Sequence, residues 1–395
     1  ETMGGSVVLI KGGRSFGFER ITDALQWQQH ETQLEIDLAA LGHNLNVYRS
    51  MLKPGTKLMV MLKAFGYGST DAELGRWLQH HGADHIAVAY TDEGVTLRQG
   101  GVTLPIMVMN PEPGTFAQLT DFNLEPELFS NDIAIAFAKF LNEVAIPQYP
   151  VHIKLDTGMH RLGFLDEDIP ALCALLKNDA GLRVVSVFTH LVASDDPDQD
   201  TYTQEQFEKF LAGCDMLQQA LGYSFIRHAA NTAAISRHPH MHLDMVRLGI
   251  GLFGFSNTPS GQPPLLPATR LFTTVAQVKK VAAGNTVGYG RRALLQRDSL
   301  IATVRIGYAD GYRRQLSNGV GQMWVGNTLA PVAGNVCMDM TMLDVTAIEG
   351  VRPGDRVEVF GTHITAEDLA KKCKTIPYEI LTGISRRVQR ILIDA

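Results

Sequence analysis

Short apolar segments and longer amphipathic segments alternate along the chain between residues 58 and 248. The apolar segments are continuous, which is typical of strands that are buried on both faces of a parallel sheet. The segments between them, such as 71–80 and 204–221, have the spacing of amphipathic helices. The eight predicted strands are 58–62, 85–89, 105–109, 124–128, 151–155, 184–189, 225–228 and 244–248.

Eight strand–helix units within about 220 residues predict a TIM (β/α)8 barrel over residues 34–266. An open, doubly wound parallel sheet is the alternative that the pattern leaves. From residue 267 to 395 the pattern changes to short β-rich runs that Gly, Asn and Asp separate. This second part is predicted to be a C-terminal antiparallel β domain, and the Pro- and Gly-rich stretch 258–267 is the expected boundary.

The first 33 residues differ from both parts. Residues 6–11 form a β-branched run before a glycine turn, and the polar, Gln-rich stretch 22–33 is predicted to be a linker. A single strand cannot fold alone. Residues 1–21 are therefore either a disordered tail or the end of a domain that lies upstream in a longer chain.

Composition narrows the possible functions. The 35 basic and 41 acidic side chains give a net charge of −6, which argues against nucleic-acid binding. The longest apolar runs are far too short to span a membrane. The four cysteines form no CxxC pair, so neither a disulfide framework nor a metal site is expected, and a cytoplasmic location is the simplest interpretation. The histidine-rich segment 238–242 is expected to be a solvated loop.

Polar side chains follow the predicted barrel strands where a TIM barrel has its active site. Lys63 ends the first strand, Lys154 and Arg161 lie at the fifth, His190 follows the sixth and Arg247 ends the eighth. Burial at a strand end would lower the pKa of the Lys63 amine, which suits a Schiff-base lysine. A lysine that merely extends its charge into solvent is the alternative.

Two further patterns, each taken alone, are weaker evidence for a functional site. Gly249 and Ile250 lie in a glycine-containing turn whose N–H groups could bind a phosphate, although an ordinary strand-to-helix turn has the same pattern. Tyr289 and Tyr308 each lie beside glycines. Either tyrosine could act as a general base if a cation lowered its pKa, or could simply pack its ring in a turn.

Taken together, the motifs resemble the bacterial alanine racemase family from residue 34 to 395. The resemblance implies a TIM barrel with a C-terminal β domain, pyridoxal 5'-phosphate as cofactor and an isomerase activity. The motifs that occur in the family's order are 63–68, 154–163, 189–190, 230–231, 245–250, 288–290, 307–311, 337–339 and 377–379.

The resemblance implies two catalytic residues. Lys63 would hold pyridoxal phosphate as a Schiff base and act as the acid/base on the D-face of the substrate. Tyr289, from the partner subunit of a homodimer with shared active sites, would be the opposite base on the L-face. His190 would lie beside the cofactor ring and bond to Tyr289.

It also implies a set of binding residues. Arg161 would approach the substrate carboxylate, Met338 would border the substrate from the second subunit, and Tyr308 and Tyr378 would narrow the entrance. Lys154 resembles a family lysine that is often carbamylated, giving an anion that orients Arg161. The cofactor-binding residues implied are Lys63, Tyr67, Arg161, His190, Asn231, Thr232, Arg247, Gly249, Ile250 and Tyr378.

The expected reaction is interconversion of L-alanine and D-alanine, which supplies D-alanine for peptidoglycan. The alternatives are a racemase for serine or for many amino acids, a non-catalytic pyridoxal-phosphate-binding protein, and a decarboxylase of diamino acids. The second domain argues against the binding protein, which resembles the barrel alone. Residues 7–15 separately resemble the closing strand of Mur ligases, so residues 1–21 are expected to be the remnant of an upstream ligase-like domain in a ligase–racemase fusion.

Overall fold

The computed structural model describes residues 31–70, 72–255 and 264–394, and it confirms the predicted barrel. Eight parallel strands follow the order β8-β7-β6-β5-β4-β3-β2-β9. The last of them along the chain, β9, pairs with the first, β2, so the sheet curves round on itself. Between β8 and β9 the Arg247 N–H donates to the carbonyl of Ala230. The strands are β2 (Lys57–Met61), β3 (His85–Val88), β4 (Ile106–Val108), β5 (Glu125–Leu128), β6 (Tyr149–Lys154), β7 (Leu182–Phe188), β8 (Ile226–His228) and β9 (Met245–Leu248).

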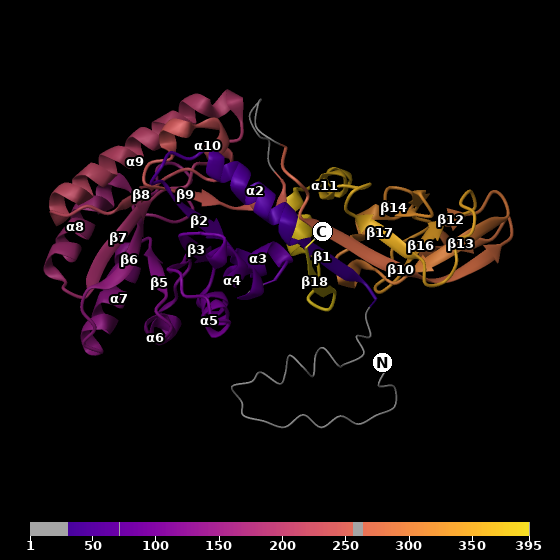
Figure 1. Cartoon of the computed structure of the whole chain (residues 1–395), viewed down its shortest axis with the longest axis horizontal. Helices are drawn as coiled ribbons and strands as arrows, with labels where there is room; N and C mark the ends of the chain where they lie inside the picture. Colours follow the sequence, from indigo (N-terminus) through magenta and orange to yellow (C-terminus); the bar gives the residue numbers. More distant parts are fainter. Residues whose placement is uncertain (1–30, 71, 256–263, 395) are drawn as a thin grey trace, which may run out of the picture.

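Helices cover the outside of the barrel (Figure 1). Helix α7 illustrates why they form: Ser130 caps its first turn, and Ile133, Phe137 and Leu141 recur every four residues on its buried face. The described helices of this part are α2 (Leu38–Ser50), α3 (Lys63–Gly68), α4 (Ala72–His80), α5 (Thr91–Gln99), α6 (Phe116–Asp121), α7 (Asn131–Glu143), α8 (Ile169–Asn178), α9 (Asp200–Leu221) and α10 (Thr232–Arg237).

The second part is the expected, mostly antiparallel β domain, which lies beside the barrel (Figure 1). Its long strand β10 pairs with three other strands. The elements are β10 (Thr269–Val281), β11 (Thr286–Val287), β12 (Ala293–Leu294), β13 (Ser299–Val304), β14 (Gln322–Val325), β15 (Thr328–Pro331), β16 (Thr341–Asp344), β17 (Arg356–Phe360), α11 (Ala366–Cys373), α12 (Pro377–Thr382) and β18 (Gln389–Ile393).

The start of the described chain differs from the expectation. Strand β1 (Gln33–Asp37) belongs to the sheet of the β domain, where it pairs antiparallel with β10 and parallel with β18. Thr32 and Gln33 were expected in the linker 22–33 but belong to this domain: Thr32 is fully buried and donates its hydroxyl to the carbonyl of Arg305 over 2.6 Å. Residues 22–30 of the expected linker lie outside the described residues. The interpretations placed on residues 1–21 lie outside the described residues.

The histidine-rich segment was wrongly expected to be solvated. His238 and His242 are buried, and the His242 Nε2 lies 2.8 Å from the carbonyl oxygen of Ile235. Burial lowers the pKa of both imidazoles. These histidines therefore pack against α10. Within the described ranges, no helix combines the length and apolar character needed to cross a membrane.

Candidate active site

Lys63 lies at the end of β2, followed by an unusual turn. Residues 64–67 all have left-handed backbone angles, with φ between 53° and 58°. Each such L-residue is less stable than a right-handed one by about 1–2 kcal/mol. The turn therefore needs contacts from its surroundings. It leaves Lys63 partly buried, and burial, followed by the charges of Arg161 and Lys154, lowers the pKa of its amine.

Side chains from both domains hold this turn. Glu93 accepts the N–H of Phe65 with one carboxylate oxygen and the N–H of Ala89 with the other, at 3.2 and 2.7 Å. From β18, Arg390 donates to the carbonyl of Gly68 over 3.0 Å. A Cβ on Gly68 would lie 2.6 Å from a backbone oxygen of α12, so only glycine allows this approach. The β domain thus fixes the position of the lysine turn.

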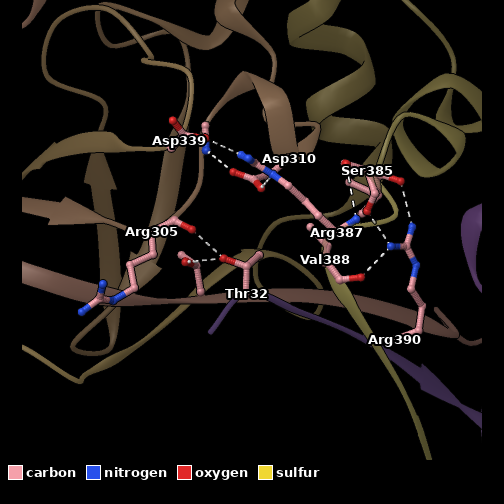
Figure 2. Close-up of polar contacts among 11 residues, drawn as sticks. Thr32, Arg305, Asp310, Asp339, Ser385, Arg387, Val388 and Arg390 are labelled. Carbon is pink, nitrogen blue, oxygen red and sulfur yellow. Dashed lines mark hydrogen bonds and ion pairs between the residues drawn. The ribbon is translucent and has the colours of Figure 1, made fainter. Parts of the chain in front are cut away.

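Replacing Arg390 tests this link between the domains. Arg390 also donates to the carbonyls of Ser385 and Val388 (Figure 2). We expect Arg390→Gln to lower the free energy of unfolding by about 1.5–3 kcal/mol, because hydrogen bonds from a charged donor are lost. Urea denaturation of the protein measures this. The exposed Arg352→Gln is the control, with an expected change within about 0.5 kcal/mol. Equal stability of the two variants would contradict the link.

Two arginines lie near enough to Lys63 for their charges to lower its pKa, and the region around Lys63, Arg161 and Arg247 is called the pocket below. Arg247 is buried on β9 and donates to the carbonyls of Thr189 and Ala229, and burial lowers its pKa to about 10. Arg161 is exposed in a loop that Asp156 folds by accepting three successive backbone N–H groups. Burial and the charges of Arg247 and Arg161 lower the pKa of His190 to about 3. The His190 imidazole is therefore neutral at pH 7.

A set of hydroxyl groups lies beside the pocket and fits a phosphate. Thr232 accepts the N–H of Gly249 over 2.8 Å, which leaves the proton of its own hydroxyl free to be donated. A Cβ on Gly249 would lie 2.7 Å from the Tyr67 hydroxyl, so the absent side chain leaves room there. The Tyr378 ring, from α12, lies 5.9 Å from that of Tyr67. Ile250 begins the short helix Ile250–Phe253 that follows.

The side chain of Asn231 does not join these hydroxyl groups but makes hydrogen bonds to other parts of the chain. Its carboxamide oxygen accepts the N–H of Ala234 and the hydroxyl of Ser194, and its amide nitrogen donates to the carbonyl of Leu191. Asn231 therefore caps α10 and joins it to the loop after β7. Its side chain supports the turn that carries Thr232.

Three other predicted site residues lie together on the β domain. Tyr289 is 71% exposed in the turn between β11 and β12, and β12 lies at the end of the domain away from the barrel (Figure 1). Asn335 donates to the carbonyl of Tyr289, and the N–H groups of Tyr308 and Ala309 donate to the carbonyls of Cys337 and Met338. The exposed residues Tyr289, Tyr308 and Met338 thus lie on hydrogen-bonded segments of the β domain and form one exposed surface.

Arg387 fixes the two loops of this surface. It donates to the buried Asp310 over 2.6 Å and to Asp339 over 2.7 Å (Figure 2). Asp310 in turn accepts the N–H of Gly307. The residues next to Tyr308 and Met338 are therefore held by a single guanidinium group.

The sequence analysis missed a buried polar chain inside the barrel. Arg247 donates to the Nδ1 of His228 over 2.9 Å, so the Nε2 of this imidazole bears the proton that Ser186 accepts. Ser186 then contacts His152, and His152 contacts Glu125, at 2.6 and 2.9 Å. The position of His228 at a strand end was the available signal. This chain orients the Arg247 guanidinium.

Two acidic residues near the site were also missed. Glu93 is the carboxylate whose charge raises the pKa of Lys63, against the larger effect of burial. Glu127 is fully buried on β5, and one of its oxygens lies 3.2 Å from the Lys154 ammonium. An acidic residue within an otherwise apolar strand was the signal that could have identified Glu127.

The fold and the site together define a class: two-domain barrel proteins in which a desolvated lysine lies near cationic side chains and hydroxyl groups. The sequence profile described as "Alanine racemase, N-terminal domain" matches residues 36–257. The profile described as "Alanine racemase, C-terminal domain" matches residues 268–392. The chain belongs to the alanine racemase family. Both profiles begin after the first 35 residues, so the expected ligase remnant gains no support from them.

Relatives match over nearly their whole length. "Alanine racemase 2" of Caldanaerobacter subterraneus subsp. tengcongensis is 36% identical, with 92% of this chain and 95% of the relative covered. The alanine racemase of Clostridium tetani is 37% identical, with coverages of 91% and 94%. The solved alanine racemase of Clostridium difficile 630 has a TM-score of 0.86 at 31% identity, with coverages of 92% and 96%. A structure from Bartonella henselae, described with covalently bound pyridoxal phosphate, has a TM-score of 0.82 at 26% identity, with coverages of 92% and 99%.

Proposed function

We propose that this chain interconverts L-alanine and D-alanine with pyridoxal 5'-phosphate. The observation that carries the proposal is the partly buried Lys63, whose lowered pKa favours the neutral, nucleophilic amine, at the edge of a pocket that fits a phosphate. The family of the chain and the alanine racemases that it matches along their length support the same reaction.

The residues present fit the cofactor. Lys63 would hold its aldehyde carbon, Tyr67, Thr232 and Gly249 its phosphate, and Arg247 its pyridine nitrogen. When bound, pyridoxal phosphate acidifies the Cα–H bond of an attached amino acid by withdrawing electrons from it. An arginine at the ring nitrogen keeps that nitrogen unprotonated, which limits this withdrawal and suppresses side reactions.

Two bases on opposite faces of Cα account for racemisation. Lys63 takes the Cα proton of D-alanine or returns it, and Tyr289 of the partner subunit does the same for L-alanine. Inversion follows because one group removes a proton from one face while the other delivers a proton to the opposite face. Arg161 holds the substrate carboxylate, and the neutral His190 accepts or donates a hydrogen bond without adding charge.

This assignment requires a homodimer with shared sites. The exposed positions of Tyr289, Tyr308 and Met338 support it, because they form a surface that a second barrel could meet. Mixing Lys63→Ala subunits with Tyr289→Phe subunits tests it. Random reassociation gives mixed dimers in which one site has both native groups, so about a quarter of the wild-type activity should return. No return of activity after verified subunit exchange would contradict shared sites.

The reaction itself is tested with the purified chain, pyridoxal phosphate and L-alanine in D2O. Deuterated D-alanine is the expected product. Cofactor binding without deuterium at Cα would favour a non-catalytic binding protein. L-serine is the comparison substrate, because the bulky Tyr378 near the phosphate pocket favours alanine. Equal turnover of serine would contradict this preference.

Two further proposals concern the location of the protein in the cell and the part of the chain that precedes the barrel. We propose a cytoplasmic protein, which the four free cysteines support. A role in supplying D-alanine for peptidoglycan follows from the proposed product. The ligase–racemase fusion stays a prediction that rests on residues 7–15 alone.

A further inference from the structure

A carboxylate stands inside the barrel beside the lysine that was expected to be carbamylated. Glu127 on β5 is 0% exposed, and its Oε1 lies 3.2 Å from the Nζ of Lys154 on the neighbouring strand β6. The strands pair in parallel, with Glu127 opposite His152, which places Glu127 and Lys154 side by side on the inner face of the barrel.

An aromatic ring and further cationic side chains lie near this pair. Lys154 and Arg247 both lie over the ring of Phe188, 5.7 and 5.1 Å from its centroid. Burial raises the pKa of Glu127, while the charges of Lys154, Arg247 and Arg161 each act to lower it and so favour the carboxylate. Glu127 is thus a buried acid close to three cationic side chains of the pocket.

The pair is hard to explain by stability alone. Taking both charges out of water has a penalty that their attraction only partly offsets, and an apolar pair of similar size is often as stable. A negative charge at this point does, however, offset the repulsion among Lys154, Arg161 and Arg247, which would otherwise drive the exposed Arg161 outward.

We infer that Glu127 is the built-in anion that keeps Lys154 as an unmodified ammonium and positions Arg161 for the substrate carboxylate. The inference rests on the proposed function for the role of Arg161. Carbamylation joins the neutral Nζ of a lysine to the carbon of CO2 and releases a proton. Glu127 opposes this step twice, because it stabilises the ammonium and because a carbamate would place a second negative charge against it. Glu127 therefore takes the place of the carbamate anion.

The first test does not depend on turnover. The wild-type protein with bound pyridoxal phosphate is equilibrated with 13C-labelled bicarbonate, and its carbonyl region is recorded by 13C NMR. We expect no carbamate resonance. A carbamate resonance of about one equivalent per chain that disappears in Lys154→Ala would overturn the inference. This result is independent of whether the protein racemises alanine, so a failure of the proposed function remains distinguishable.

The second test separates positioning from folding. Glu127→Gln should raise the KM for alanine about tenfold or more, because Arg161 loses its anchor, and should change kcat less. Glu127→Asp, which retains the charge, should recover part of the affinity. Glu143→Gln, an exposed carboxylate on the outer helix α7, is the control and should leave the KM near the wild-type value. An unchanged KM in Glu127→Gln, or an equal rise in Glu143→Gln, would overturn the positioning role.

Discussion

Lys63→Ala should lower kcat for alanine racemisation by about 10⁴-fold or more. The substitution removes one of the two proposed bases, and general acid–base groups commonly contribute 10²–10⁴-fold. It also removes the amine that would hold the cofactor. The neighbourhood makes this amine unusual, because burial, Arg161 and Lys154 all favour its neutral form.

The control for this variant lies on the strand that precedes Lys63. Lys57 begins β2 with an exposed side chain, so Lys57→Ala should keep nearly the full rate. Reduction of the wild-type holoprotein with borohydride, followed by peptide mass analysis, should find the cofactor on Lys63. A substantial rate in Lys63→Ala, or labelling of another lysine, would remove Lys63 from its proposed role.

The sequence predicted the barrel because its strands carry their own signal. A continuous apolar run such as 58–62 can be buried on both faces whatever its neighbours are, so each strand could be identified alone. Strands β1 and β18 were missed because polar residues stand among the apolar ones of β1 and before those of β18. These two strands form because they pair with distant parts of the chain. Leu34 lies opposite Leu271 and Arg390, which are more than 230 positions away.

As with the strands, the site residues that could be proposed from the sequence are those whose own position in the chain carries the signal. Basic residues at strand ends, such as Lys63 and Arg247, follow from chain position and barrel topology. Glu127 and Glu93 could not be assigned in this way. Their importance lies in which side chains they face, and those partners come from other strands or from a strained turn. The expectation that Lys154 is carbamylated likewise could not take account of Glu127, because Glu127 lies on the neighbouring strand.

Tyr289→Phe should have the second largest effect, and the effect should depend on the face of the substrate. Loss of the phenolic proton carrier should slow racemisation in both directions by about 10²–10⁴-fold. Exchange of the Cα proton of D-alanine with D2O should continue, because Lys63 of the opposite subunit serves that face. Exchange of the Cα proton of L-alanine should fall with racemisation.

Following both exchange reactions by NMR distinguishes catalysis from damage to the fold. A loosened surface would slow both substrates alike, whereas the loss of one base affects one face only. Tyr90→Phe supplies the control, since Tyr90 is also exposed but lies on the barrel. If Tyr289→Phe exchanged D-alanine and L-alanine equally fast, the base on the L-face would have to be another group. The exposed surface of Tyr289, Tyr308 and Met338 would then owe its structure to subunit association alone.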